Sequence, residues 1–304
     1  MQWINLLEYI KYWNILQNLE EKSPFDLIVY ENKNFENNTS LEVTDMNELG
    51  LDFSVWWKLL AAAKNYKNIL IVIDQLSYIY LQPFIQKAIK EDVNFTILNL
   101  GSGISWCLNK QLLDTNDIGT MINYNLDVYE PFDFISFFHY LKSSKKQYIK
   151  IPNKELPGNL IKDNESFINY DEKLINLQDY GLTWDEWTII TWAWMLQDAV
   201  IAHSILREKE KNFDIFCSTN YNFEITEEFK ESIQKTEKLI LLIDQEKWNF
   251  FEKILKSKLW EKQIMDLEFV CITPKEEIQT IHKENLWHAV EFDWENIAQR
   301  ILWN

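Results

Sequence analysis

The sequence predicts an α/β protein of two domains, in each of which helices flank a mostly parallel sheet. Short apolar runs rich in β-branched residues alternate with longer helical stretches, the pattern of parallel sheets covered on both faces. A length of 304 residues is typical of two domains. Hydrophobic residues make up 47% of the chain, enough for a sizeable core in each domain.

Five apolar runs predict strands in the first half of the chain. They lie at 27–30, 69–73, 94–98, 127–129 and 148–151. The stretches between and before them predict helices, at 3–21, 52–66, 78–91 and 132–143. Asp133 can cap the last of these helices, because its carboxylate can accept a hydrogen bond from a backbone N–H of the first turn.

The second half repeats this alternation. Strands are predicted at 187–191, 213–217, 238–243 and 268–272. Helices are predicted at 195–210, 226–235, 248–259 and 293–302. The segment 156–179 contains Pro157-Gly158 among mixed polar residues and is predicted to be a linker. We therefore expect one domain at 1–155 and a second at 180–304.

Charge and composition disfavour several classes of partner. The chain has 30 Lys and Arg against 47 Asp and Glu, a net charge of −17, which argues against nucleic acid and anionic membranes. No apolar run reaches the ~20 residues that span a bilayer, and no secretory signal is expected at the start. Cys107, Cys217 and Cys271 are far apart and odd in number, so we expect reduced thiols in a cytoplasmic protein.

Tryptophan is unusually common and glycine unusually rare. The chain has 14 Trp and six Gly, and six Gly in 304 residues is about 2%, against about 7% in an average protein. Trp192 and Trp194 stand in Thr191-Trp-Ala-Trp-Met195, where a strand-to-helix turn favours small residues. One interpretation is a Trp-rich core. The other is that many of these residues are glycine in the living cell, in a lineage that reads the codon UGA as Gly.

Four segments carry a resemblance to a known family. Asp117–Asp133 ends in a V-x-x-P-x-D pattern and is followed by Tyr148-Ile-Lys-Ile-Pro-Asn-Lys-Glu-Leu-Pro157. The second half adds Asp179–Met195 and Lys235-Thr-Glu-Lys-Leu-Ile-Leu-Leu-Ile-Asp244. In this order and spacing, the segments resemble the pyrimidine-binding and C-terminal domains of the transketolase family of thiamine diphosphate enzymes. A glycine of the family falls on Trp192.

The resemblance implies an enzyme that transfers a two-carbon ketol unit between sugar phosphates, with thiamine diphosphate and Mg²⁺ as cofactors. The Gly-Asp-Gly…Asn motif with which the family holds the metal is not found in the sequence. The chain therefore resembles the C-terminal subunit of a split transketolase, or the similar beta subunit of a 2-oxoacid dehydrogenase. A separate pyrophosphate-binding alpha-type subunit would hold the metal, in an α2β2 heterotetramer that also self-associates through both domains of this chain.

Thiamine catalysis needs a carboxylate at the N1′ atom of the aminopyrimidine, which favours the tautomer that generates the nucleophile. The resemblance places Asp52 at the family glutamate, shortly before the small-residue helix Val55–Ala63. Asp is one methylene shorter, and a misplacement of about 1 Å can cost about 100-fold in rate. Glu48 is the second candidate, one turn earlier. The structural alternative for Asp52 is a helix N-cap.

Other site positions match less closely. Tyr80 lies nearest the family aromatic that stacks on the pyrimidine, and its structural alternative is a core residue on an amphipathic helix. The loop Gly101–Asn109 lacks the His with which the family commonly contacts substrate. Lys150, Asn153 and Lys154 stand near the position of the family's substrate-phosphate Arg, which a Lys replaces only as a point charge.

These departures leave two further interpretations open. The chain can be a catalytically impaired relative that serves as a structural or regulatory subunit. It can also be an unrelated flavodoxin-like binding protein, which needs no partner chain.

The codon hypothesis makes a prediction that the gene itself tests. On the glycine interpretation, most of the 14 Trp positions should be encoded by UGA, because glycine there restores a normal glycine content and the small residues that turns require, whereas on the Trp-rich interpretation they carry the ordinary Trp codon. Reading the codon at each position decides the matter. Ordinary Trp codons throughout would contradict the hypothesis and leave the indole rings as native.

Overall fold

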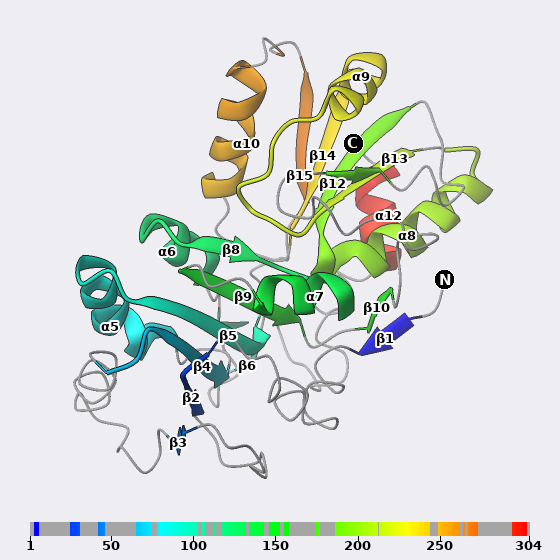
Figure 1. Cartoon of the computed structure of the whole chain (residues 1–304). Helices are drawn as coiled ribbons and strands as arrows, with labels where there is room; N and C mark the ends of the chain where they lie inside the picture. Colours follow the sequence, from blue (N-terminus) through cyan, green and yellow to red (C-terminus); the bar gives the residue numbers. More distant parts are fainter. Residues whose placement is uncertain are drawn as a thin grey trace. The chain divides into compact units, whose positions relative to one another are not determined.

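The computed structural model describes residues 3–5, 25–30, 42–45, 65–74, 78–102, 105–106, 112–113, 117–131, 134–142, 146–152, 155–157, 174–176, 186–211, 213–243, 249–261, 264, 267–272 and 294–302. The described elements form two compact units (Figure 1). Each unit has a parallel-dominated sheet with flanking helices, so the predicted α/β class is confirmed. The predicted boundaries at 155 and 180 stay a prediction.

The first unit is built on a six-stranded sheet. Its elements are β1 (Trp3–Asn5), β2 (Leu27–Tyr30), β3 (Glu42–Asp45), β4 (Asn68–Asp74), α5 (Tyr78–Lys90), β5 (Asn94–Ser102), α6 (Asp117–Asn123), β8 (Asp127–Tyr129), α7 (Phe134–Leu141), β9 (Gln147–Pro152) and β10 (Glu155–Pro157). The sheet has the order β3-β2-β4-β5-β9-β8, and every neighbouring pair is parallel. The short strands β1 and β10 pair antiparallel beside it.

Helices cover both faces of this sheet. On one face, Phe84 of α5 meets Phe95 of β5 edge to face at 5.5 Å. On the other face, Tyr140 of α7 stacks on Tyr129 of β8 at 4.1 Å, and the Tyr140 carbonyl accepts a hydrogen bond from Gln147 Nε2. The central strands are therefore buried on both sides, which explains their nearly continuous apolar sequence.

The second unit has a five-stranded sheet. Its elements are β6 (Ser105–Trp106), β7 (Leu112–Leu113), β11 (Ile175–Asn176), β12 (Trp187–Trp192), α8 (Ala193–Glu208), β13 (Phe213–Ser218), α9 (Glu227–Thr236), β14 (Lys238–Leu242), α10 (Asn249–Glu261), β15 (Glu268–Ile272) and α12 (Trp294–Leu302). The order is β11-β13-β12-β14-β15, with β11 antiparallel to β13 and the other pairs parallel. The hairpin β6–β7 belongs to this unit although it precedes α6 in the chain.

A chain of hydroxyl groups fastens α9 to its sheet. Thr188 Oγ1 lies 2.7 Å from Ser232 Oγ and 2.9 Å from Thr236 Oγ1, and Ser232 donates to Asp214 Oδ2 at 2.6 Å. All four side chains are buried. At the start of the helix, Thr226 Oγ1 caps it by accepting from the Phe229 N–H. Each of these four buried side chains thus has a hydrogen-bond partner, as buried polar groups require.

The structure departs from the sequence predictions at several places. Residues 3–5 form a strand rather than the start of a helix, because they pair with β10. The strands β3, β6 and β7 and the helix α6 were not predicted, and the predicted linker contains part of β10 and all of β11. Residues 65–66 form a turn instead of ending the predicted helix 52–66, whose remainder lies outside the described residues. Asp133, the predicted cap, also lies outside them.

The buried histidine of α8 makes the stability of the second unit sensitive to acid. Burial lowers the pKa of His203 from 6.5 to about 4, helped by the nearby charge of Arg207 and opposed by Asp214. Because the folded-state pKa is the lower one, the unfolded chain takes up the proton first. Stability should therefore fall as the pH drops from 6.5 towards 4, by up to about 3 kcal/mol from this group.

The variant His203→Leu isolates this contribution. Urea unfolding at pH 7, 5.5 and 4.5 should show a smaller acid loss in the variant than in the wild type. Equal losses in the two proteins would contradict the assignment of the effect to His203.

Candidate functional site

Parallel sheets bind ligands beyond the carboxyl ends of their strands, where successive connections leave in opposite directions. In the first unit, β2 connects to β3 on one side and β4 connects to β5 on the other, while β2 and β4 are neighbours. The switch therefore lies between the ends of β2, at Tyr30, and of β4, at Asp74. We take the carboxyl edge of this sheet as the candidate site.

The sequence-predicted residues follow elements that end at this edge. Glu48 comes three positions after Asp45, the last residue of β3, and Asp52 comes seven positions after it. Both lie outside the described residues. Their assignment as candidate catalytic carboxylates stays a prediction.

Tyr80 lies in the first turn of α5, which begins shortly after the end of β4. Its backbone is thus placed at the carboxyl edge, while its side chain is not among those described. Asn153 and Lys154, from the predicted phosphate neighbourhood, lie outside the described residues as well. The topology thus places the backbone at Tyr80 and the end of β3 at the same edge of the sheet.

Five fully buried polar side chains lie together in the first unit, and we call them the polar cluster. They come from β5, from β9, from the residue after β8 and from the first residue of α6: Asn99, Asp117, Glu130, Tyr148 and Lys150. Strand register explains the grouping, since Asn99 pairs with Lys150 and Val128 pairs with Tyr148. Side chains at paired and alternate positions share a face, so all four sheet-derived members point to one side. Sequence reasoning did not find this cluster.

One half of the polar cluster is an ion pair. Lys150 Nζ lies 3.4 Å from Glu130 Oε2, and both side chains have no exposed surface. Two charges can stay buried here because each neutralises the other. The expectation that Lys150 stands near a substrate phosphate is therefore wrong for its side chain, which is held under the edge by Glu130. A charged residue within the apolar run 148–151 was the signal that a buried partner was required.

The other half is a hydrogen-bonded tyrosine. The Tyr148 hydroxyl donates to Asp117 Oδ2 and accepts from Asn99 Nδ2, both at 2.5 Å. The phenol thereby ties the start of α6 to β5 and β9. Because Asp117 opens α6, its carboxylate also lies at the helix end that favours negative charge.

The corresponding edge of the second sheet is filled by aromatic rings. Trp192, the last residue of β12, is 3% exposed and stacks on Tyr221 with ring centroids 5.0 Å apart, while Phe223 meets it edge-on. Its backbone has φ −118° and ψ 171°, which any residue adopts. The expected demand for a small residue is thus not seen at this turn. Among the described residues, those with positive φ other than Gly are Asp92, Asn125, Glu210 and Glu237, and none is Trp.

No described group of three or more His, Cys, Asp or Glu side chains could hold a metal ion. No helix in the described part of the chain is long and apolar enough to cross a membrane.

Comparisons with solved structures relate this fold to known proteins. No protein-family model matches the sequence, and no curated protein matches it. A split-gene transketolase, described as an inactive β4 tetramer, superposes with a TM-score of 0.65 at 12% identity, covering 96% of this chain and 95% of that one. The fold is that of the transketolases.

Two full-length transketolases match as well. The enzyme from Campylobacter jejuni subsp. jejuni NCTC 11168 gives a TM-score of 0.67 at 10% identity, covering all of this chain and 47% of that one. A Pichia stipitis mutant complexed with xylulose 5-phosphate gives 0.62 at 11% identity, covering 99% and 45%. The chain thus spans about half the length of these full-length transketolases and nearly all of the split-gene chain.

The buried ion pair yields a stability prediction. Lys150→Met should cost about 3–5 kcal/mol, because it leaves the Glu130 carboxylate buried without its cation. The double variant Glu130→Met with Lys150→Met should recover most of this loss, since no charge then remains. Urea unfolding of both variants measures the difference.

The exposed pair Lys211–Glu186, at 3.1 Å, serves as the matched control. Lys211→Met should cost less than about 1 kcal/mol, because water screens this pair. If Lys150→Met were no more costly than Lys211→Met, the buried pair would not hold the edge together.

Proposed function

We propose that this chain is the pyrimidine-binding and C-terminal subunit of a split transketolase-type enzyme, which transfers a two-carbon ketol unit between sugar phosphates. The observation that carries the proposal is the pair of coverages. The chain spans 95% of the split-gene transketolase but only 47% and 45% of the two full-length chains. The match to a split-gene chain of nearly the same extent supports a subunit that works with a separate pyrophosphate-binding alpha-type subunit.

The same neighbour supports a proposal for the assembly. The split-gene transketolase is described as an inactive β4 tetramer. A chain that can self-associate, but that lacks its alpha-type partner, would form an inactive tetramer of this kind. We therefore propose an active α2β2 assembly in the cytoplasm, with contacts between copies of this chain and with the alpha-type chain.

Thiamine diphosphate would supply a carbon nucleophile for the ketol transfer, and Mg²⁺ would be held by the partner subunit. The elements of the first unit fit the pyrimidine end of the cofactor, since the end of β3 and the start of α5 meet at one carboxyl edge. The carboxylate of Glu48 or Asp52 would accept the hydrogen bond of the aminopyrimidine ring. Tyr80 would stack on that ring.

The polar cluster supports this role from beneath. Its five members link β5, β9, the residue after β8 and the start of α6 through hydrogen bonds and an ion pair. Such a network holds the edge in one conformation, and a rigid edge can position the catalytic carboxylate within the small tolerance that proton transfer needs.

A second candidate function is a non-catalytic structural or regulatory subunit. Two observations favour it. The loop after β5 lacks the His expected for substrate contact, and Lys150 is buried against Glu130 instead of facing a phosphate. The two functions make different predictions for the reconstituted pair.

Activity of the reconstituted pair tests the proposal. The chain is mixed with its alpha-type partner, thiamine diphosphate, Mg²⁺ and xylulose 5-phosphate as ketol donor, and transfer to an aldose phosphate is measured. Glu48→Gln or Asp52→Asn should lower kcat about 100-fold or more, because general acid–base catalysis supplies about 10²–10⁴-fold. Tyr80→Ala should weaken cofactor binding. Glu231→Gln, an exposed change on α9, is the control and should have no effect.

The outcomes separate the alternatives. Full activity in both carboxylate variants would show that neither Glu48 nor Asp52 is the catalytic group. A pair that assembles but neither binds thiamine diphosphate nor transfers a ketol unit would overturn the enzymatic proposal and favour the structural subunit. A chain that stays monomeric with no affinity for the partner would contradict both.

A further inference from the structure

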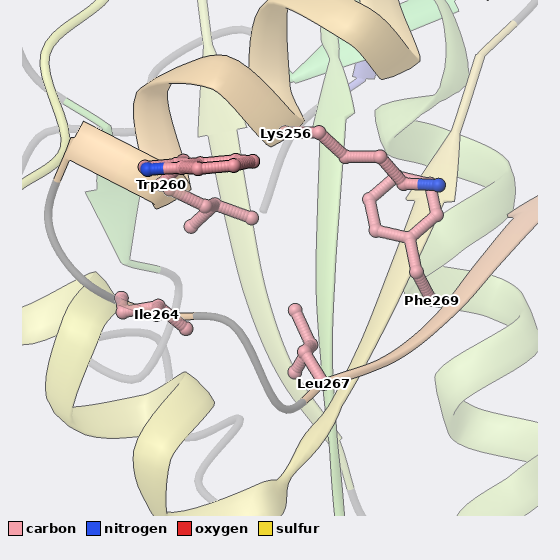
Figure 2. A pocket seen from close by; sticks show the side chains of 6 residues that line it. Lys256, Trp260, Ile264, Leu267 and Phe269 are labelled. Atoms are coloured by element: carbon pink, nitrogen blue, oxygen red, sulfur yellow. The ribbon is translucent and has the colours of Figure 1, made fainter.

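The second unit has a surface pocket between α10 and its edge strand β15 (Figure 2). Three lining residues, Lys256, Leu259 and Trp260, share one face of α10, because their spacing of three and four residues places them on neighbouring turns. Ile264 and Leu267 line the pocket from the chain that follows, and Phe269 lines it from β15. None of these residues belongs to the site assigned to the proposed enzyme.

Aromatic and apolar side chains form the walls of this pocket. Figure 2 shows Trp260 and Phe269 on opposite sides, with Ile264 and Leu267 below the space between them. Trp260 is 71% exposed, the one large hydrophobic side chain counted as exposed in the described part of the chain. An indole left in water beside an apolar hollow offers a large surface for a flat ligand to cover.

The volume of the pocket sets the size of the ligand. At about 270 Å³, it is larger than the cavity of roughly 150 Å³ that holds a benzene ring in another protein. The space suits a fused bicyclic ring with a short polar group, and it is small for a nucleotide. A ring of this kind can lie against Trp260 and reach towards Phe269.

The charge of the lining sets the sign of the ligand. Lys256 is the one charged residue among the six that line the pocket, and its Nζ lies 4.6 Å from the centre of the Phe269 ring. The ring holds the ammonium group at the pocket wall through a cation–π contact. An ammonium there attracts a carboxylate and repels a cation. The net charge of −17 disfavours polyanions, so a single negative charge fits best.

We propose that the second unit binds a flat aromatic acid in this pocket, with the ring against Trp260 and Phe269 and its single carboxylate on Lys256. The site is separate from the proposed ketol-transfer chemistry and does not depend on it. Its specificity is for an apolar bicyclic body with one acidic group.

Binding of 2-naphthoate to the full-length chain tests the proposal, with the neutral 2-naphthylmethanol as the matched ligand. Isothermal titration should show one saturable site that prefers the acid by up to about fivefold. Lys256→Met should abolish this preference, because the apolar stem stays and the charge is lost. Trp260→Ala should weaken both ligands. Lys253→Met changes an exposed lysine of the same helix that does not line the pocket, and should bind like the wild type.

Both test positions are exposed, so the variants should keep the wild-type circular dichroism and thermal transition. The absence of saturable binding would overturn the proposal. Equal affinity for the acid and the alcohol, or equal effects of Lys256→Met and Lys253→Met, would also overturn it. Binding that survives Trp260→Ala unchanged would show that the acid sits elsewhere.

Discussion

Burial of both faces of two parallel sheets is the constraint on which the rest of this structure depends. The central strand β4 is buried along Ile69–Ile73, and its sequence there is apolar without interruption. Several buried polar groups in these layers are matched by a partner. Lys150 meets Glu130, and Thr188 meets Ser232. Chemistry is thereby restricted to the strand ends, where the backbone leaves the core and polar side chains can reach a ligand.

The two carboxyl edges differ in what fills them. The first edge has a base of hydrogen-bonded and paired polar groups, and the candidate catalytic positions follow the elements that end there. The second edge is closed by the stacked rings of Trp192 and Tyr221. The first is therefore suited to holding a polar ring in a defined orientation, and the second is suited to stability. A surface pocket of the second unit lies at α10 instead.

The sequence predicted most strands and helices, because buried parallel strands have a strong local signature. It missed what depends on distant partners. Glu42–Asp45 contains two acidic residues and no apolar run, and it is a strand because β2 pairs with it. The local sequence of residues 3–5 predicts a helix, but these residues form a strand because they pair with β10. The sequence showed Lys150 as a charged residue within an apolar run. Its partner Glu130 depends on the register between β8 and β9, which a local sequence pattern cannot predict.

The strand order of the first sheet has a consequence for synthesis on the ribosome. β8 leaves the exit tunnel before β9, yet β9 lies between β8 and β5. Until Gln147–Pro152 has emerged, β5 has one unpaired edge and β8 has no neighbour. An open, apolar edge invites pairing with another nascent chain. Because the chain is made from its N-terminus, a pause in translation before β9 therefore prolongs the period in which β5 can pair with another nascent chain.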